Sequence, residues 1–174
     1  QLTFNTVLKM KIDEKQIKFV ERKTIKQIEE GSFLCPKFNK EDLLPCITIE
    51  NETNEVLMFS YVNETALKKS ISSKKAHYFS RSRKKVWLKG ETSGMFQDIQ
   101  DIFIDDDQDS IIFVVNLREP SKGGNIASCH VGYKSCFYRK IKIIDKKISL
   151  VFTEDKKVFD PDIVYKGIEN PTKI

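Results

Sequence analysis

Short apolar runs separated by turn-forming residues limit the fold of this chain more than any other feature of its sequence. The runs lie at residues 46–50, 55–62, 77–80, 85–89, 99–104, 111–117, 135–144 and 148–152. Runs of this length are typical of β-strands, and the segment Asn51-Glu-Thr-Asn54 between the first two predicts a β-hairpin. The pattern therefore predicts a β-rich α+β fold.

Two helices are also expected. Asp13 and Gly31 are placed to begin and end an N-terminal helix over 13–30, in which apolar residues recur at roughly helical spacing. Asn63 can cap a short second helix near residues 64–73. A chain of 174 residues is long enough for one ordinary domain with extensions and too short for two comfortable cores, so we expect a single domain.

Several functional classes are disfavoured by the same sequence. It has no run of about 18 apolar residues, and residues 1–10 have neither a charged start nor a long apolar stretch, so membrane insertion and secretion are not expected. The net charge of +5 is mild and its lysines are scattered. Zinc-finger spacing and helix-turn-helix patterns are absent, so nucleic acid is not an expected partner. We expect a cytoplasmic protein.

An acidic segment lies between two of the apolar runs. If the backbone is extended there, Asp105, Asp107 and Asp109 point to one side and Asp106 to the other. Three carboxylates on one face suit a hard cation such as Mg²⁺, which also takes water and substrate phosphate. A solvated acidic turn is the competing interpretation.

Two of the four cysteines are close in sequence. Six residues, His130 among them, separate Cys129 from Cys136, and two thiolates at this spacing can reach one zinc ion. A catalytic zinc needs three protein ligands, so the third must come from elsewhere in the chain or from a second subunit. Alternatively, the cysteines are small buried residues and His130 is a core imidazole.

Basic and aromatic side chains alternate over residues 77–89, and the loop Gly90-Glu-Thr-Ser-Gly94 follows. Arginine binds phosphate bidentately, and backbone N–H groups of a glycine-containing loop can cradle it. The competing interpretation is an exposed basic hairpin whose aromatic side chains pack in the core.

In order, these segments resemble the phosphoribosyl-AMP cyclohydrolases. The matching motifs are Val56-Leu-Met-Phe-Ser-Tyr-Val-Asn63, His77-Tyr-Phe-Ser-Arg-Ser-Arg83, Trp87-Leu-Lys-Gly-Glu-Thr-Ser-Gly94 and Ser128-Cys-His-Val-Gly-Tyr-Lys-Ser-Cys-Phe-Tyr-Arg139. The resemblance implies an intertwined homodimer that uses Zn²⁺ and Mg²⁺ to hydrolyse the N1–C6 bond of the adenine ring in phosphoribosyl-AMP, a step of histidine biosynthesis. It also implies a cyclohydrolase-like domain over 31–145. Outside the resemblance, the sequence predicts a helical extension over 1–30 and a charged extension over 146–174, which is expected to follow the surface or fray.

The resemblance assigns roles to individual residues. Zinc is expected on Cys129, Cys136 and Asp106, magnesium on Asp105, Asp107 and Asp109, and proton transfer on His130. The expected substrate-binding residues are His77, Arg81, Arg83, Trp87, Lys89, Gly90, Glu91, Thr92, Ser93, Gly94 and Arg139.

The sequence departs from the family at one expected zinc ligand. The acidic motif of the family reads Asp-Cys-Asp-x-Asp, with its cysteine bound to a zinc shared across the dimer, whereas this chain has Asp106. Asp106 can bind zinc through oxygen, or Cys46 or Cys35 can supply the missing sulfur. In a third interpretation the zinc site is lost, and the chain is a paralogue acting on another purine-like nucleotide or a non-catalytic nucleotide-binding protein.

Overall fold

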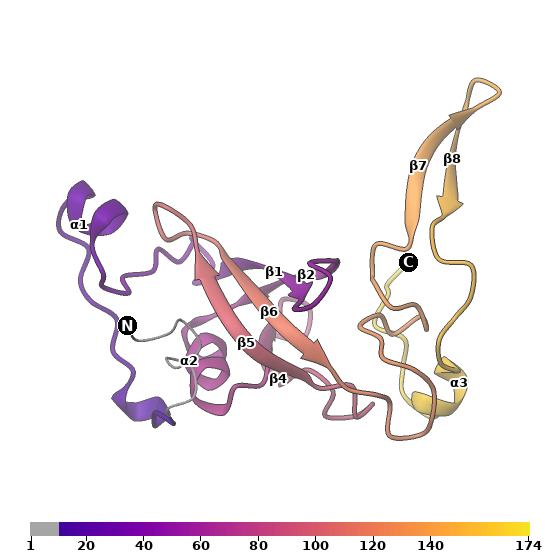
Figure 1. Ribbon diagram of the computed structural model, residues 1–174, viewed down its shortest axis with the longest axis horizontal. Coiled ribbons are helices and arrows are strands. Elements are labelled where there is room, and N and C mark those ends of the chain that lie inside the picture. Colours follow the sequence, from indigo (N-terminus) through magenta and orange to yellow (C-terminus); the bar gives the residue numbers. More distant parts are fainter. Residues whose placement is uncertain (1–10) are drawn as a thin grey trace.

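The computed structural model describes residues 11–174, and its centre is a four-stranded sheet in the order β2-β1-β6-β5 (Figure 1). Its strands are β1 (Leu44–Glu50), β2 (Val56–Val62), β5 (Gln97–Ile104) and β6 (Ile111–Leu117). The pairs β1–β2 and β5–β6 are antiparallel hairpins. Parallel pairing of β1 with β6 joins the two hairpins into one sheet.

The described residues also form two further hairpins and four short helical segments. The hairpins are β3 (His77–Ser80) with β4 (Lys85–Leu88), and β7 (Arg139–Ile144) with β8 (Lys147–Phe152). The helical segments are η2 (Glu14–Gln16), α1 (Ile25–Glu30), α2 (Glu64–Ser73) and α3 (Pro161–Val164). The β7–β8 hairpin projects away from the rest of the chain (Figure 1). Within residues 11–174, none of these helices is long and apolar enough to cross a membrane.

The β-rich α+β prediction is confirmed, as are the hairpin around Asn51–Asn54 and the helix capped by Asn63, whose side chain accepts from the Ala66 N–H at 2.8 Å. The continuous helix over 13–30 was wrong. Asp13 caps only the 3₁₀ turn η2, which ends at the extended residue Ile17. A second helix, α1, begins after its own cap at Thr24, which is also extended. Residues 1–10 of the expected N-terminal extension lie outside the described part.

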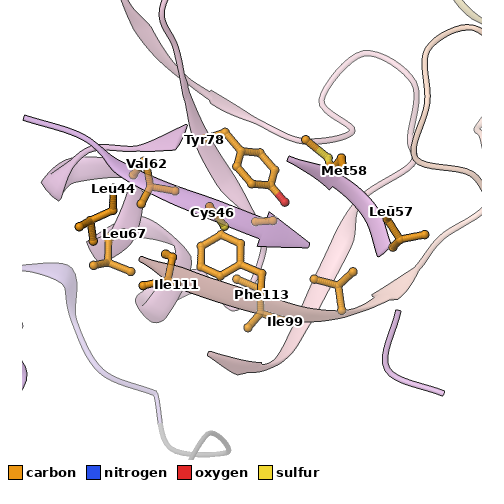
Figure 2. Packing of buried hydrophobic residues seen from close by; sticks show 13 residues of the cluster. Leu44, Cys46, Leu57, Met58, Val62, Leu67, Tyr78, Ile99, Ile111 and Phe113 are labelled. Atoms are coloured by element: carbon orange, nitrogen blue, oxygen red, sulfur yellow. The ribbon is translucent and has the colours of Figure 1, made fainter. Parts of the chain in front are cut away.

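The core lies on one face of the sheet, toward which alternate residues of β1 point (Figure 2). Leu44, Cys46 and Thr48 of β1 are fully buried there, and Phe113 of β6 packs beside the ring of Tyr78. Helix α2 contributes the buried residues Ala66, Leu67 and Ser70 to the same side. Complete burial of each large aliphatic or aromatic side chain contributes about 1.5–3 kcal/mol, so this layer holds β3, α2 and the sheet together.

The opposite face of the sheet carries an apolar row that crosses all four strands. Strand pairing aligns Phe59 of β2 with Ile47 of β1, Ile47 with Ile112 of β6, and Ile112 with Phe103 of β5. Phe59, Ile47 and Phe103 are exposed. We call these four residues the outer-face row.

Candidate functional site

The acidic segment forms the turn between β5 and β6. Asp105 closes this turn: one carboxylate oxygen accepts from the backbone N–H groups of Asp109 at 2.9 Å and Ser110 at 3.1 Å, and the other accepts from the Ser110 hydroxyl at 2.6 Å. One oxygen each of Asp105, Asp107 and Asp109 lies within 4.8 Å of the other two. The expected grouping of these three residues is present, although a turn produces it and not the alternation of an extended strand.

Crowding of like charges perturbs the acidic turn. Partial burial and the neighbouring Asp105 and Asp107 raise the pKa of Asp109. Burial also acts to raise the pKa of Asp105, but hydrogen bonds from Ser110 and Asp109 outweigh it and lower that pKa. A bound cation would offset this repulsion, and oxygen donors at this spacing suit Mg²⁺. The turn therefore fits a magnesium ion, while Asp106 is exposed and outside the cluster.

The N-terminal segment holds this turn in place. The guanidinium of Arg22 donates to the Cys35 carbonyl at 2.6 Å and to the Asp107 carbonyl at 2.9 Å. Gln108, buried inside the turn, accepts from the Cys35 N–H at 2.8 Å and donates to the Ile28 carbonyl at 3.1 Å. Neither Arg22 nor Gln108 was predicted, because their partners are distant in sequence.

The two expected zinc cysteines lie together in the loop that precedes β7. The thiols of Cys129 and Cys136 are hydrogen-bonded, which lowers the pKa of Cys129 to about 7 against the opposing effect of burial and raises that of Cys136. Lys89 is buried beside them; burial lowers its pKa and the two sulfurs oppose the shift. A buried ammonium next to paired thiols stabilises their thiolate forms, which are the forms that bind metal. The pair therefore fits a zinc ion but supplies two of its ligands.

His130 follows Cys129 and has an unsatisfied ring nitrogen. Its Nε2 is buried and has no hydrogen-bond partner among residues 11–174. Burial and the positive charge of Lys89 lower the pKa of His130, and a side-chain contact with Asn170 opposes them. A buried polar atom without a partner, in the same loop as two interacting thiols, is typical of a site that a ligand completes. The imidazole is thus favoured in its neutral form and is available to accept a proton.

A buried polar network connects the cysteine loop to the core. The Tyr78 hydroxyl contacts Thr48 Oγ1 and donates to Gln97 Oε1, both at 2.6 Å, and Gln97 Nε2 donates to Ser128 Oγ at 2.7 Å. Ser128 directly precedes Cys129. Sequence reasoning missed this network, because Thr48, Tyr78 and Gln97 occur in strands that were read only for their apolar neighbours.

The acidic turn and the cysteine loop lie at opposite ends of β5. Ser128 is bonded to Gln97, the first residue of that strand, whereas the acidic turn follows its last residue, Ile104. Seven residue steps of about 3.3 Å separate these ends by roughly 23 Å. Asp106 therefore does not meet Cys129 and Cys136 within one chain. Cys35 and Cys46 are fully buried and do not meet them either: Gln108 donates to the Cys35 sulfur at 3.2 Å, and Cys46 lies in the core.

The expected phosphate-binding residues surround β3, β4 and the following turn. Arg81 lies over the ring of Tyr61 and Arg83 over that of Trp87, at 4.4 and 5.7 Å from the ring centroids. Arg139 similarly lies 5.0 Å from the Tyr138 ring, at the start of β7. All three arginines are exposed, and Arg83 Nε donates to the Ser80 hydroxyl at 3.2 Å. Stacking uses only the faces of a guanidinium group, so its edge can still donate to a phosphate.

The glycine loop after β4 closes on itself. The Gly94 N–H donates to the Gly90 carbonyl at 2.8 Å, and Gly90 has a φ of +93° with no room for a Cβ beside Phe96. Glu91 and Thr92 are exposed at its tip, whereas Ser93 is buried.

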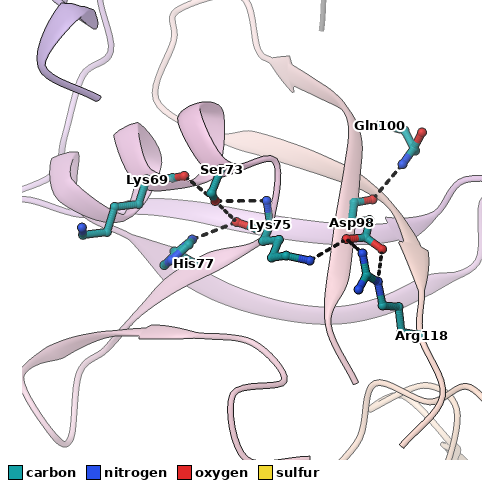
Figure 3. Close-up of polar contacts among 7 residues, drawn as sticks. All are labelled: Lys69, Ser73, Lys75, His77, Asp98, Gln100 and Arg118. Atoms are coloured by element: carbon teal, nitrogen blue, oxygen red, sulfur yellow. Dashed lines mark hydrogen bonds and ion pairs between the residues drawn. The ribbon is translucent and has the colours of Figure 1, made fainter. Parts of the chain in front are cut away.

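His77 sits at the edge of this region, where its Nδ1 is 2.8 Å from the Lys75 carbonyl (Figure 3). Because a carbonyl can only accept, Nδ1 carries the proton. Lys75 and Arg118 in turn bind the carboxylate of Asp98, which fastens this corner to β5.

Comparison with known proteins places these features in one family. The sequence profile of the phosphoribosyl-AMP cyclohydrolase family matches residues 58–138. The phosphoribosyl-AMP cyclohydrolase of Bradyrhizobium diazoefficiens is 42% identical over 140 residues, which cover 80% of this chain and 95% of the relative. That of Chlorobium phaeobacteroides is 46% identical over 130 residues, or 74% and 86% of the two chains. A histidine biosynthesis bifunctional protein of Thermoanaerobacter pseudethanolicus is 48% identical over 131 residues, 75% of this chain and 55% of that protein. The profile match contains both the acidic turn and the cysteine loop.

Proposed function

Because the chain belongs to the phosphoribosyl-AMP cyclohydrolase family, we propose that it hydrolyses the N1–C6 bond of the adenine ring in phosphoribosyl-AMP, as a step of histidine biosynthesis. The observation that carries this proposal within the chain is the buried, unpartnered Nε2 of His130, the residue that follows Cys129 in the loop where the thiols of Cys129 and Cys136 interact. The loop thus contains a neutral base, His130, and two thiols that can bind a metal ion. A base and a metal ion are the groups with which hydrolases activate water.

In the proposed reaction, water adds to C6, the N1–C6 bond breaks, and a proton is delivered to N1. Cys129 and Cys136 would hold a zinc ion, which would supply a water whose pKa is close to 7. His130 accepts the proton of this water at Nε2 and returns it to N1, so the imidazole ends the cycle neutral. Lys89 favours the thiolate state of the cysteines throughout.

The remaining residues bind and orient the substrate. Asp105, Asp107 and Asp109 would hold Mg²⁺, which would screen phosphate charge at the acidic turn. Arg81 and Arg83 offer bidentate donors to the phosphates from the β3–β4 hairpin. Holding the phosphates at fixed points places the adenine ring next to the water, which removes much of the entropic barrier of a bimolecular reaction.

We further propose that the enzyme is an intertwined homodimer in which each zinc site combines the cysteine pair of one copy with Asp106 of the other. Two observations support it. Asp106 follows the end of β5 opposite to the cysteine loop, and the two ends of that strand are roughly 23 Å apart. The outer-face row is also an exposed apolar surface on the sheet. The β7–β8 hairpin has a second one, because cross-strand pairing puts four exposed residues on one of its sides: Ile141, Leu150, Ile143 and Ile148. Association of two copies through such faces removes apolar surface from water.

The test is hydrolysis of phosphoribosyl-AMP, followed by the absorbance change on ring opening. Protein loaded with Zn²⁺ and Mg²⁺ is compared with chelated protein and with His130→Gln, which keeps a similar volume but removes the base. Turnover that is lost in both controls supports the proposal. Folded, metal-loaded dimers without turnover, but with nucleotide binding, would instead favour a paralogue acting on another purine-like nucleotide or a non-catalytic binding protein.

A further inference from the structure

The segment from Glu154 to Asn170, here called the C-terminal strap, packs along the cysteine loop. The Val158 N–H donates to the Gly132 carbonyl at 2.8 Å, and the Val158 carbonyl accepts from the Asn125 N–H at 2.9 Å. Gly132 lies between the two cysteines in sequence. The backbone of the strap is thus hydrogen-bonded to the loop that carries both thiols.

Two buried side chains anchor the strap beside the cysteine loop. Its Phe159 and Val164 are buried in a small cluster with Met95 and Ala127. A Cβ on Gly132 would come within 3.1 Å of the Phe159 carbonyl oxygen. Little displacement of the strap is therefore possible without displacement of the cysteine loop.

Glu154, the first residue of the strap, makes the most specific of these contacts. One of its carboxylate oxygens accepts from the Lys134 N–H at 2.8 Å, and the other accepts from the Ser135 N–H at 3.1 Å. These are the two residues that immediately precede Cys136. A carboxylate that accepts from two successive backbone N–H groups fixes both peptide planes and makes stronger hydrogen bonds than a neutral acceptor.

The other side of the loop is fixed by β2. The Cys136 N–H donates to the Leu57 carbonyl at 2.7 Å, and the Ser135 hydroxyl donates to the Val56 carbonyl at 2.8 Å. Residues 134–136 are therefore held between the strand and Glu154. Without Glu154 the contacts to β2 remain, but two backbone donors of the loop lose their acceptor.

We propose that Glu154 is a positioning residue for the metal site: by fixing the backbone of Lys134 and Ser135, it directs the thiol of Cys136 toward that of Cys129. This role rests on the proposed zinc site. Groups that orient metal ligands without binding the metal typically change metal affinity about 10- to 100-fold when they are substituted.

The test is a titration of the full-length protein with Co²⁺, in which the charge-transfer absorption between thiolate and Co²⁺ reports the cysteines directly. Glu154→Ala should bind Co²⁺ about 10- to 100-fold more weakly than the unmodified protein. Glu154→Asp, which keeps the charge, should recover part of the affinity. Asp155→Asn is the matched control, because Asp155 is the next residue and is exposed, and it should leave the affinity unchanged. The melting temperature and the oligomeric state of each variant are measured as well, and affinities are compared between variants in which both match the unmodified protein.

Each outcome discriminates. An unchanged Co²⁺ affinity and spectrum in Glu154→Ala overturns the role of Glu154 but leaves the proposed function standing. Absence of the thiolate band in the unmodified protein overturns the zinc site and with it this inference. If Glu154→Ala does not fold, Glu154→Gln decides: it keeps one acceptor oxygen at nearly the same volume, and a full retention of affinity there refutes the proposal.

Discussion

The outer-face row gives a direct test of the proposed dimer through Phe103→Asp. Phe103 is 58% exposed and lies on edge strand β5, at one end of the row. Because its side chain already contacts water, the substitution should change the free energy of unfolding of a single chain by about 0.5 kcal/mol or less. Its effect should appear only when two copies associate.

The magnitude follows from the exposed area. A phenylalanine side chain offers about 200 Å², of which 58% is about 115 Å², and at about 25 cal/mol per Å² its burial in a dimer contributes about 3 kcal/mol. A twofold-symmetric interface contains each residue twice, and the buried aspartates add a desolvation cost. The dimer dissociation constant should therefore rise at least about 100-fold, since each 1.4 kcal/mol is a factor of ten.

Sedimentation velocity over a concentration series measures this change. The matched control is Ile163→Asp, which places the same charge at an equally exposed apolar residue, 53% accessible, on α3 and off the sheet. We expect Phe103→Asp to sediment as a monomer at concentrations where Ile163→Asp and the unmodified protein are dimers. If Phe103→Asp stays dimeric at every concentration, the outer-face row is not the interface, and if the unmodified protein is monomeric, the shared metal site is refuted.

Substitutions at three further positions test the interior and the site. Tyr78→Phe leaves the buried Oε1 of Gln97 without its donor and should lower the free energy of unfolding by about 1–3 kcal/mol, measured by urea denaturation; no loss would show that the network is dispensable. Asp106→Ala should lower zinc occupancy and turnover, while Asp106→Cys should retain or improve both. Metal analysis measures the zinc content of each variant, and equal zinc content in the two would show that Asp106 is not a ligand. Burial acts to raise the pKa of Asp98, but Arg118 and Lys75 outweigh it and lower that pKa. The ion pairs of Asp98 therefore stabilise the fold at pH values above its unfolded-state pKa, and this stabilisation is lost as the pH falls through the folded-state pKa. Asp98→Asn should therefore reduce the melting temperature near neutral pH and converge with the unmodified protein at acidic pH, and equal melting curves at both would contradict the assignment.

Local patterns predicted those parts of the fold whose partners are close in sequence. The β1–β2 hairpin follows from two apolar runs and a four-residue turn, and α2 from its Asn63 cap. The parallel pairing of β1 with β6 joins segments some 65 residues apart, as in Cys46 with Ile111, and no local signal encodes it. The same limit explains the wrong helix over 13–30: its periodicity was real, but the Val20 N–H pairs with the distant Leu34 carbonyl in an extended segment.

The site divides in the same way. Cys129, His130 and the aspartates of the acidic turn could be selected from the sequence, because their chemistry suits metal ions and proton transfer and they stand in or beside motifs that resemble the family. The residues that hold them could not. Gln108, Gln97 and Glu154 are ordinary polar residues whose function lies only in backbone groups that folding brings to them.

The departure at Asp106 changes ligand softness and preserves charge. A carboxylate and a thiolate each carry one negative charge, so the proposed site of Cys129, Cys136 and Asp106 has the same net charge as one built from three thiolates. Oxygen is a harder donor, and zinc accepts carboxylate ligands in catalytic sites. An exposed side chain on a turn held by Arg22 and Gln108 can also be exchanged without disturbing the backbone around it. The substitution is therefore expected to weaken zinc binding and to shift metal preference toward harder cations, while the geometry that positions the ligand persists.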